Sequence, residues 1–131
     1  MPEAGQELLT DGDHVPMTCV SAGTAGDAVV VTGNREVDLV NTSNGRVDGQ
    51  LANDVEAGEE VAVNMHGAYY QKVTSTVTAD SFLTGSTTAG SLREINTGGA
   101  TGEDPQARIL LTLEDSMTMD NGQEIVLTHY Q

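Results

Sequence analysis

Apolar and polar residues alternate with a period of two along most of this chain, which is the pattern of strands that bury one face of a sheet. Glycine and asparagine separate these stretches. The pattern predicts strands at 28–32, 36–40, 60–65, 68–73, 82–83, 92–95, 107–113 and 125–128, with 74–78 extending the fourth. Because Gly67 separates 60–65 from 68–73, we expect those two strands to form a hairpin. Helical periodicity is scarce, and only 45–60 has room for a short helical turn.

Short strands about ten residues apart predict an all-β protein, a small single-domain β-barrel or sandwich. Asn44-Gly45 is a tight-turn dipeptide, since both residues tolerate positive φ. Two polar segments do not fit the core. Residues 1–16 are expected to form an extended N-terminal arm, which leaves 17–131 as the barrel-like domain, and 96–106 is expected to be an exposed loop.

One local pattern recurs, in which a glycine turn is followed by an acid and then a strand. Residues 25–33 resemble residues 57–63, and 78–85 is a weaker third copy. The acid that follows the turn is suited to accept hydrogen bonds from free backbone N–H groups. In a Gly-rich β protein, such short sequence patterns also recur by chance. The irregular spacing of the three copies does not predict a repeat protein.

The net charge of the chain says more about its partners and its environment than the predicted strands do. The chain carries 20 Asp+Glu against 5 Lys+Arg, a net charge of −15, and the acids are spread along its whole length. This charge repels phosphate backbones and anionic lipid surfaces, so nucleic-acid and membrane partners are not expected. Salt screens the self-repulsion of such a chain. The composition therefore favours a protein of a high-salt environment, with an ordinary acidic surface domain as the alternative.

The sequence carries no recognisable catalytic or cofactor motif. His14, His66 and His129 lie far apart along the chain, and Cys19 is expected to be a buried, inert thiol. Neighbouring acids are uninformative in so acidic a chain, although weak divalent-cation binding at subunit contacts stays open. We therefore expect no enzyme activity, no cofactor and no dedicated metal site. No apolar run approaches the roughly 18 residues of a membrane span, and no signal peptide is expected.

The order of these elements resembles the small capsid decoration, or cement, proteins of tailed phages and of haloarchaeal tailed viruses. The residues that carry the resemblance are the polar arm, the two turn–acid–strand units, Gly67 to Tyr70, a Gly/Ser/Thr-rich middle and the strand after Ala107. The resemblance covers about residues 15–115, so 114–131 lie beyond the family pattern. It implies a small β-barrel, often a homotrimer, that sits on the capsid exterior of a virion assembled in the host cytoplasm. Its implied partners are the major capsid protein and itself, and its implied role is to stabilise contacts between capsid subunits.

Such a protein needs contacts rather than chemistry. We expect Leu8, Leu9 and Val15 in the arm, together with Tyr69 and Tyr70, to contact the capsid or another copy. An arm can add a strand to a neighbouring sheet through main-chain pairing. The tyrosine pair is expected to split between core and surface. Two alternatives remain open: a turret or spike component that binds the host surface, and a non-viral halophilic β-domain that acts as a binding module.

Overall fold

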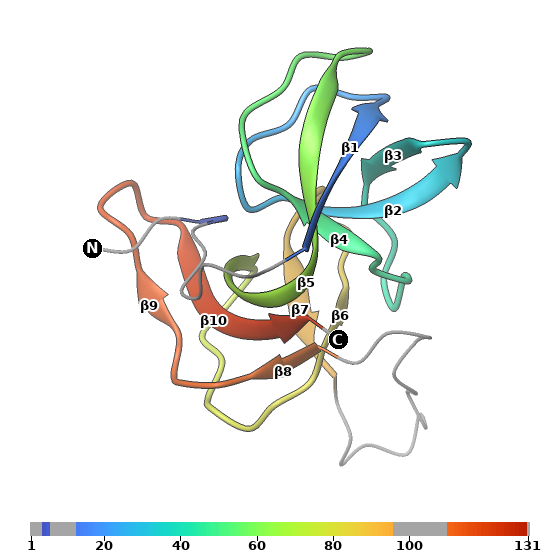
Figure 1. Cartoon of the computed structure of the whole chain (residues 1–131). Coiled ribbons are helices and arrows are strands. Elements are labelled where there is room, and N and C mark those ends of the chain that lie inside the picture. Colours follow the sequence, from blue (N-terminus) through green and yellow to red (C-terminus); the bar gives the residue numbers. More distant parts are fainter. Residues whose placement is uncertain (1–3, 6–12, 96–109, 131) are drawn as a thin grey trace.

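The computed structural model describes residues 4–5, 13–95 and 110–130, and within these residues every regular element is a strand. The strands are β1 (Asp13–Cys19), β2 (Ala28–Gly33), β3 (Glu36–Leu39), β4 (Gly49–Leu51), β5 (Glu60–Val73), β6 (Leu83–Gly85), β7 (Leu92–Glu94), β8 (Leu110–Thr112), β9 (Met117–Thr118) and β10 (Glu124–Tyr130). The all-β prediction is confirmed. Figure 1 shows two groups of strands, β1 to β4 in the upper part and β6 to β10 in the lower part, with β5 passing through both.

The upper group closes into a five-stranded β-barrel. Its strand order is β1-β3-β2-β4-β5, and β5 pairs back onto β1. β1 and β3 run parallel, whereas the other pairs in the ring are antiparallel. Each of these five strands therefore has a paired neighbour on both sides.

β5 is a single 14-residue strand, so the predicted hairpin at Gly67 is wrong. The strand changes partners where the turn was expected. Up to His66 it pairs with β1 and β4, and from Gly67 onward it pairs with β10. Gly67 has φ 126°, a conformation that favours glycine, and it bends the strand without reversing it.

The lower strands form a second ring around the far half of β5. β10 joins β5 to β8, the bridge between Phe82 and Leu111 joins β8 to the start of β6, and β7 returns to β5. β9 extends this sheet beside β10. Residues 114–131, which lie beyond the resemblance described above, contain β9 and β10. β10 is part of the folded domain, because it pairs with β5, β8 and β9.

The barrel is built from two copies of one unit that exchange hydrogen bonds. The first copy contains the Gly26 turn (residues 24–27) and the second contains the Gly58 turn (residues 56–59), 32 residues later. The amide of Gly26 donates to Leu51 O and that of Gly58 to Cys19 O, each at 2.8 Å, and residues 51 and 19 also differ by 32.

The pairing of the strands is reciprocal in the same way. Thr18 pairs with Glu60. The residue 32 positions after Thr18 is Gln50, and the residue 32 positions before Glu60 is Ala28. These two residues also pair with each other. Gly23 and Val55 bond to each other in both directions at 3.0 Å. This reciprocity is the signature of a local two-fold relationship. A third turn with the same closing bond, Ser91 N to Thr88 O, follows after a further 32 residues, in place of the third copy expected at 78–85.

Three apolar clusters fill the molecule, and the first two lie inside the two rings. The barrel interior holds Cys19, Val29, Val37, Leu51, Val61 and Val63. The second cluster joins barrel residues to the second ring and contains Ala28, Val40, Val47, Tyr69, Val73, Val77, Leu83, Leu92, Leu110, Val126 and Tyr130. The third covers the outer face of β5 and β10 and contains Ala4, Ala68, Tyr70, Ile125 and Leu127.

Three further expectations need correction. Residues 13–16 belong to β1, so the predicted arm overlaps the barrel. Residues 45–60 contain β4 and the Gly58 turn instead of a helical turn, because Gln50 and Leu51 are held in register with β2 and β5. β5 ends at Val73, so 74–78 does not extend it. In the described part of the chain, no helix is long and apolar enough to cross a membrane.

Candidate functional site

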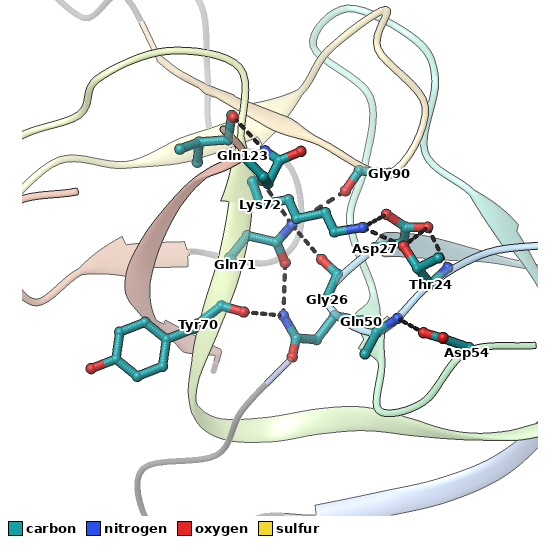
Figure 2. Close-up of polar contacts among 12 residues, drawn as sticks. Thr24, Gly26, Asp27, Gln50, Asp54, Tyr70, Gln71, Lys72, Gly90 and Gln123 are labelled. Atoms are coloured by element: carbon teal, nitrogen blue, oxygen red, sulfur yellow. Dashed lines mark hydrogen bonds and ion pairs between the residues drawn. The ribbon is translucent and has the colours of Figure 1, made fainter. Parts of the chain in front are cut away.

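A buried polar network lies where the barrel meets the second ring, and Gln71 is its centre (Figure 2). The Gln71 amide nitrogen donates to Gly26 O at 3.0 Å and to Gly90 O at 3.3 Å. Its carbonyl oxygen accepts from the Gln50 amide at 3.0 Å and from the Tyr130 hydroxyl. The fully buried Gln71 thus ties β5 to the Gly26 turn, β4 and β10 at once.

The network continues to Asn64, which contains its one unpaired atom. The Asn64 amide donates to Gln50 Oε1 at 3.0 Å, and both side chains are buried. Among the described side chains, Asn64 Oδ1 is the buried polar atom that has no hydrogen-bond partner. Such an atom has a desolvation cost of about 1–3 kcal/mol.

The only lysine of the chain belongs to the same junction. Lys72 Nζ lies 2.9 Å from Asp27 Oδ1 and also contacts the Thr24 hydroxyl. The two side chains are only 16% and 9% exposed. Asp27 Oδ2 accepts from the Thr24 amide at 2.8 Å, so the carboxylate closes the Gly26 turn while the ammonium neutralises it.

The N-terminal residues Ala4 and Gly5 are docked against the Gly26 turn. Gly5 N donates to Tyr70 O at 2.7 Å, and Ala4 is buried in the third apolar cluster. A Cβ on Gly26 would stand 2.8 Å from both the carbonyl carbon of Ala4 and the amide nitrogen of Gly5. The two backbones therefore approach more closely than a residue with a Cβ atom at position 26 would allow.

The structure separates the predicted contact residues. Leu8, Leu9 and the 96–106 loop lie outside the described residues. Val15 is half-buried in β1, where it pairs with Val63. Tyr69 and Tyr70 point to opposite faces of β5, but both faces are covered, so both side chains are buried. The expected split between core and surface is therefore wrong, because the Ala4 cluster covers the second face.

Sequence reasoning missed a small apolar strip at the second ring. Phe82 and Leu113 are 36% and 46% exposed, and Phe82 lies opposite the half-buried Leu111 in an antiparallel bridge. Residues directly opposite in such a bridge share a face, as do residues two apart along a strand. Phe82 and Leu111 therefore share a face, and the exposed Leu113 follows just beyond the end of β8. Phe82 is the single phenylalanine of the chain, which was the available signal.

The sequence analysis singled out Cys19 and the three histidines, and the structure describes all four. Burial raises the pKa of the Cys19 thiol, which keeps it protonated and unreactive. The folded chain brings His66 and His129 together, with ring centroids 6.3 Å apart, although they are distant in sequence. Within the described ranges, no group of three or more His, Cys, Asp or Glu side chains is arranged to hold a metal ion.

Comparison with known proteins gives a likeness of fold. No protein-family model and no curated protein matches the sequence. A solved structure described as the crystal structure of head fiber gp8.5 N base in bacteriophage phi29 is similar, with a TM-score of 0.60 and 17% identity. The match covers 89% of this chain and 92% of that chain. It therefore extends over both rings and shows a shared all-β fold.

Proposed function

We propose that this chain is a structural virion protein, a decoration or cement protein that binds the outside of a tailed-virus capsid and stabilises contacts between major capsid subunits in high salt. The observation that carries the proposal is the likeness, over nearly the whole of both chains, to the base of a phage head fibre. The proposed partners are the major capsid protein and further copies of this chain, as a homotrimer. The proposed location is the capsid exterior, on particles assembled in the host cytoplasm.

Two features of the molecule support a role in contacts over a role in chemistry. At the ring junction Gln71 bonds to Gln50 and to Gly26 O, and Lys72 pairs with Asp27. The Cys19 thiol is buried in the barrel. The net charge of −15 suits a surface that faces concentrated salt, since carboxylates keep a protein hydrated and soluble. We accordingly propose that the protein is not an enzyme.

The test is to mix the purified chain with undecorated heads and to measure what sediments with them in molar salt. A decoration protein should saturate at a fixed number of copies per head, whereas an unrelated acidic β protein of similar size should stay in the supernatant. Heads that gain no protein would refute the proposal. The oligomeric state of the free chain, measured in the same salt, tests the trimer.

A turret or spike component is the second candidate, because the similar structure is itself described as a fibre base. The two roles differ in their effect on the shell. A cement protein should raise the temperature at which heads release their DNA. A spike component should leave that temperature unchanged while increasing the binding of particles to host cells.

A further inference from the structure

We infer that Asn121 is a site of spontaneous chemical modification, at which the side-chain amide is lost through ring closure onto the main-chain nitrogen of Gly122. The inference comes from comparing the two Asn-Gly steps of the chain, Asn44-Gly45 and Asn121-Gly122. It stands apart from the proposed function, because it concerns the chemistry of one turn and holds whatever the chain binds.

The reaction needs an asparagine side chain that reaches the next main-chain nitrogen. The Gly122 nitrogen bonds to Cγ of Asn121 and closes a five-membered succinimide ring, while the side-chain amide leaves as ammonia and takes the proton that the Gly122 nitrogen gives up. Water then opens the ring at either carbonyl, which yields aspartate or isoaspartate. A glycine after the asparagine hinders the attack least, because glycine has no Cβ.

The two steps share the main-chain hydrogen bond that opposes the attack. The Gly45 amide donates to Thr42 O and the Gly122 amide donates to Met119 O, each at 2.9 Å. In both turns the attacking nitrogen must therefore release an equivalent bond first. A difference in reactivity has to come from the asparagine side chains and their surroundings.

The first of the two asparagines, Asn44, is fastened to β6. Its Oδ1 accepts from the Thr84 hydroxyl at 3.2 Å, and its amide donates to Gly85 O at 3.0 Å. The Gly85 amide in turn donates to Gly45 O at 3.1 Å. Asn44 is half-buried and Thr84 is buried. Ring closure at Asn44 has to break contacts with a strand that is distant in sequence, so the fold suppresses it.

Asn121 is exposed, at the tip of the hairpin that joins β9 to β10 (Figure 1). Its Oδ1 accepts from the amide of Gln123 at 2.9 Å, which folds the side chain back along its own main chain, over Gly122. Negative charge develops on this oxygen as Cγ is attacked, and an N–H donor aimed at it stabilises that charge. A Cβ on Gly122 would meet nothing within 4 Å, so the ring has room to form.

The modification alters the hairpin tip in two ways. Either product adds one carboxylate to a chain that already carries a net charge of −15. Isoaspartate also lengthens the main chain by one carbon before Gly122, which moves the Gly122 amide away from Met119 O and opens the turn. The pairing of β9 with β10 lies outside the altered turn, so the change is confined to the tip.

The experiment incubates the folded full chain in mildly alkaline molar salt made with oxygen-18 water, followed by trypsin in ordinary water and mass spectrometry. Trypsin cuts after arginine, which places Asn44 in peptide 36–46 and Asn121 in peptide 109–131. We expect Asn121 to lose ammonia and take up oxygen-18 about tenfold faster than Asn44, or more. The product at Asn121 should include isoaspartate, identified by electron-transfer fragmentation. Equal rates at the two sites, or aspartate as the sole product at Asn121, would overturn the inference.

Two further comparisons test whether the fold sets the difference. In denaturant the two rates should approach each other, and a ratio that persists there would assign the difference to local sequence and overturn the inference. Thr84→Val removes the hydroxyl that binds Asn44 Oδ1 and keeps the shape of the side chain. It should speed the reaction at Asn44 and leave Asn121 unchanged. No change at Asn44, or an equal change at both sites, would also count against the inference.

Discussion

The close contact between Gly5 and Gly26 makes a quantitative prediction about the substitution Gly26→Ala. Any non-glycine residue at a φ near +90° carries a strain of about 1–2 kcal/mol. In Gly26→Ala the new methyl group also overlaps Ala4 and Gly5, so the N-terminal segment must leave its site. The variant then loses the buried Ala4 side chain, worth about 0.8 kcal/mol, and the bond from Gly5 to Tyr70 O, worth about 1 kcal/mol.

Gly58→Ala isolates the strain from the lost contact. Gly58 has nearly the same φ, but its added methyl group meets nothing. We expect a loss of about 3 kcal/mol in the free energy of unfolding for Gly26→Ala and about 1 kcal/mol for Gly58→Ala. Denaturant titrations in a fixed salt concentration measure both values.

Hydrogen exchange gives an independent check at the atom concerned. The amide of Gly5 should be protected in the native chain and in Gly58→Ala, and unprotected in Gly26→Ala, because its acceptor is Tyr70 O. Equal destabilisation by the two substitutions, or a Gly5 amide still protected in Gly26→Ala, would refute the reasoning that the glycine exists to admit the N-terminal segment.

Three further predictions follow from charge. Lys72→Met leaves the Asp27 carboxylate buried without its cation and should cost about 3 kcal/mol, measured by denaturation; a change below 0.5 kcal/mol, the scale of surface pairs, would mean that the pair is effectively solvated. Hydrogen bonds from Ser116 and Thr118, each 2.6 Å, lower the pKa of Glu124, so this stabilisation is present above the ordinary carboxyl pKa and is lost as the pH falls through the lowered one. Thr118→Val should raise the pKa of Glu124 in an NMR titration, and an unmoved pKa would contradict the assignment. The free energy of unfolding should rise with salt concentration as the charge of −15 is screened, and a stability independent of salt would contradict the high-salt interpretation.

Local sequence patterns located some of the strands. β3 begins at the predicted residue because Val37 lies between half-buried neighbours, and β2 begins at the predicted residue because its β-branched run follows the Gly26 turn, although Ala28 and Val29 are both buried. β1 and β4 were missed, since their pairing partners are distant and neither shows a clean alternation. They are strands because they pair in register with β5, and that pairing is not visible in the sequence.

The polar junction could not be predicted, because glutamine is ordinarily a surface residue. Gln50 and Gln71 are buried only because the two rings meet there, which is a property of the assembled fold. The likeness of residues 25–33 to residues 57–63 was recognised in the sequence, but the third copy was expected at 78–85. The shared φ and the reciprocal hydrogen bonds show how the first two copies pair, and the third closing bond lies between Ser91 and Thr88.

Because strands of one copy pair with strands of the other, the barrel pairs can form only in a restricted order along the chain. β1 pairs with β3 and β5, whereas the strand that follows it directly, β2, pairs with β3 and β4. During synthesis, β1 therefore has no antiparallel partner until the chain up to His66 has emerged from the ribosome. Closing such long loops is slow, so this small domain should refold more slowly than a barrel of simple hairpins with the same length.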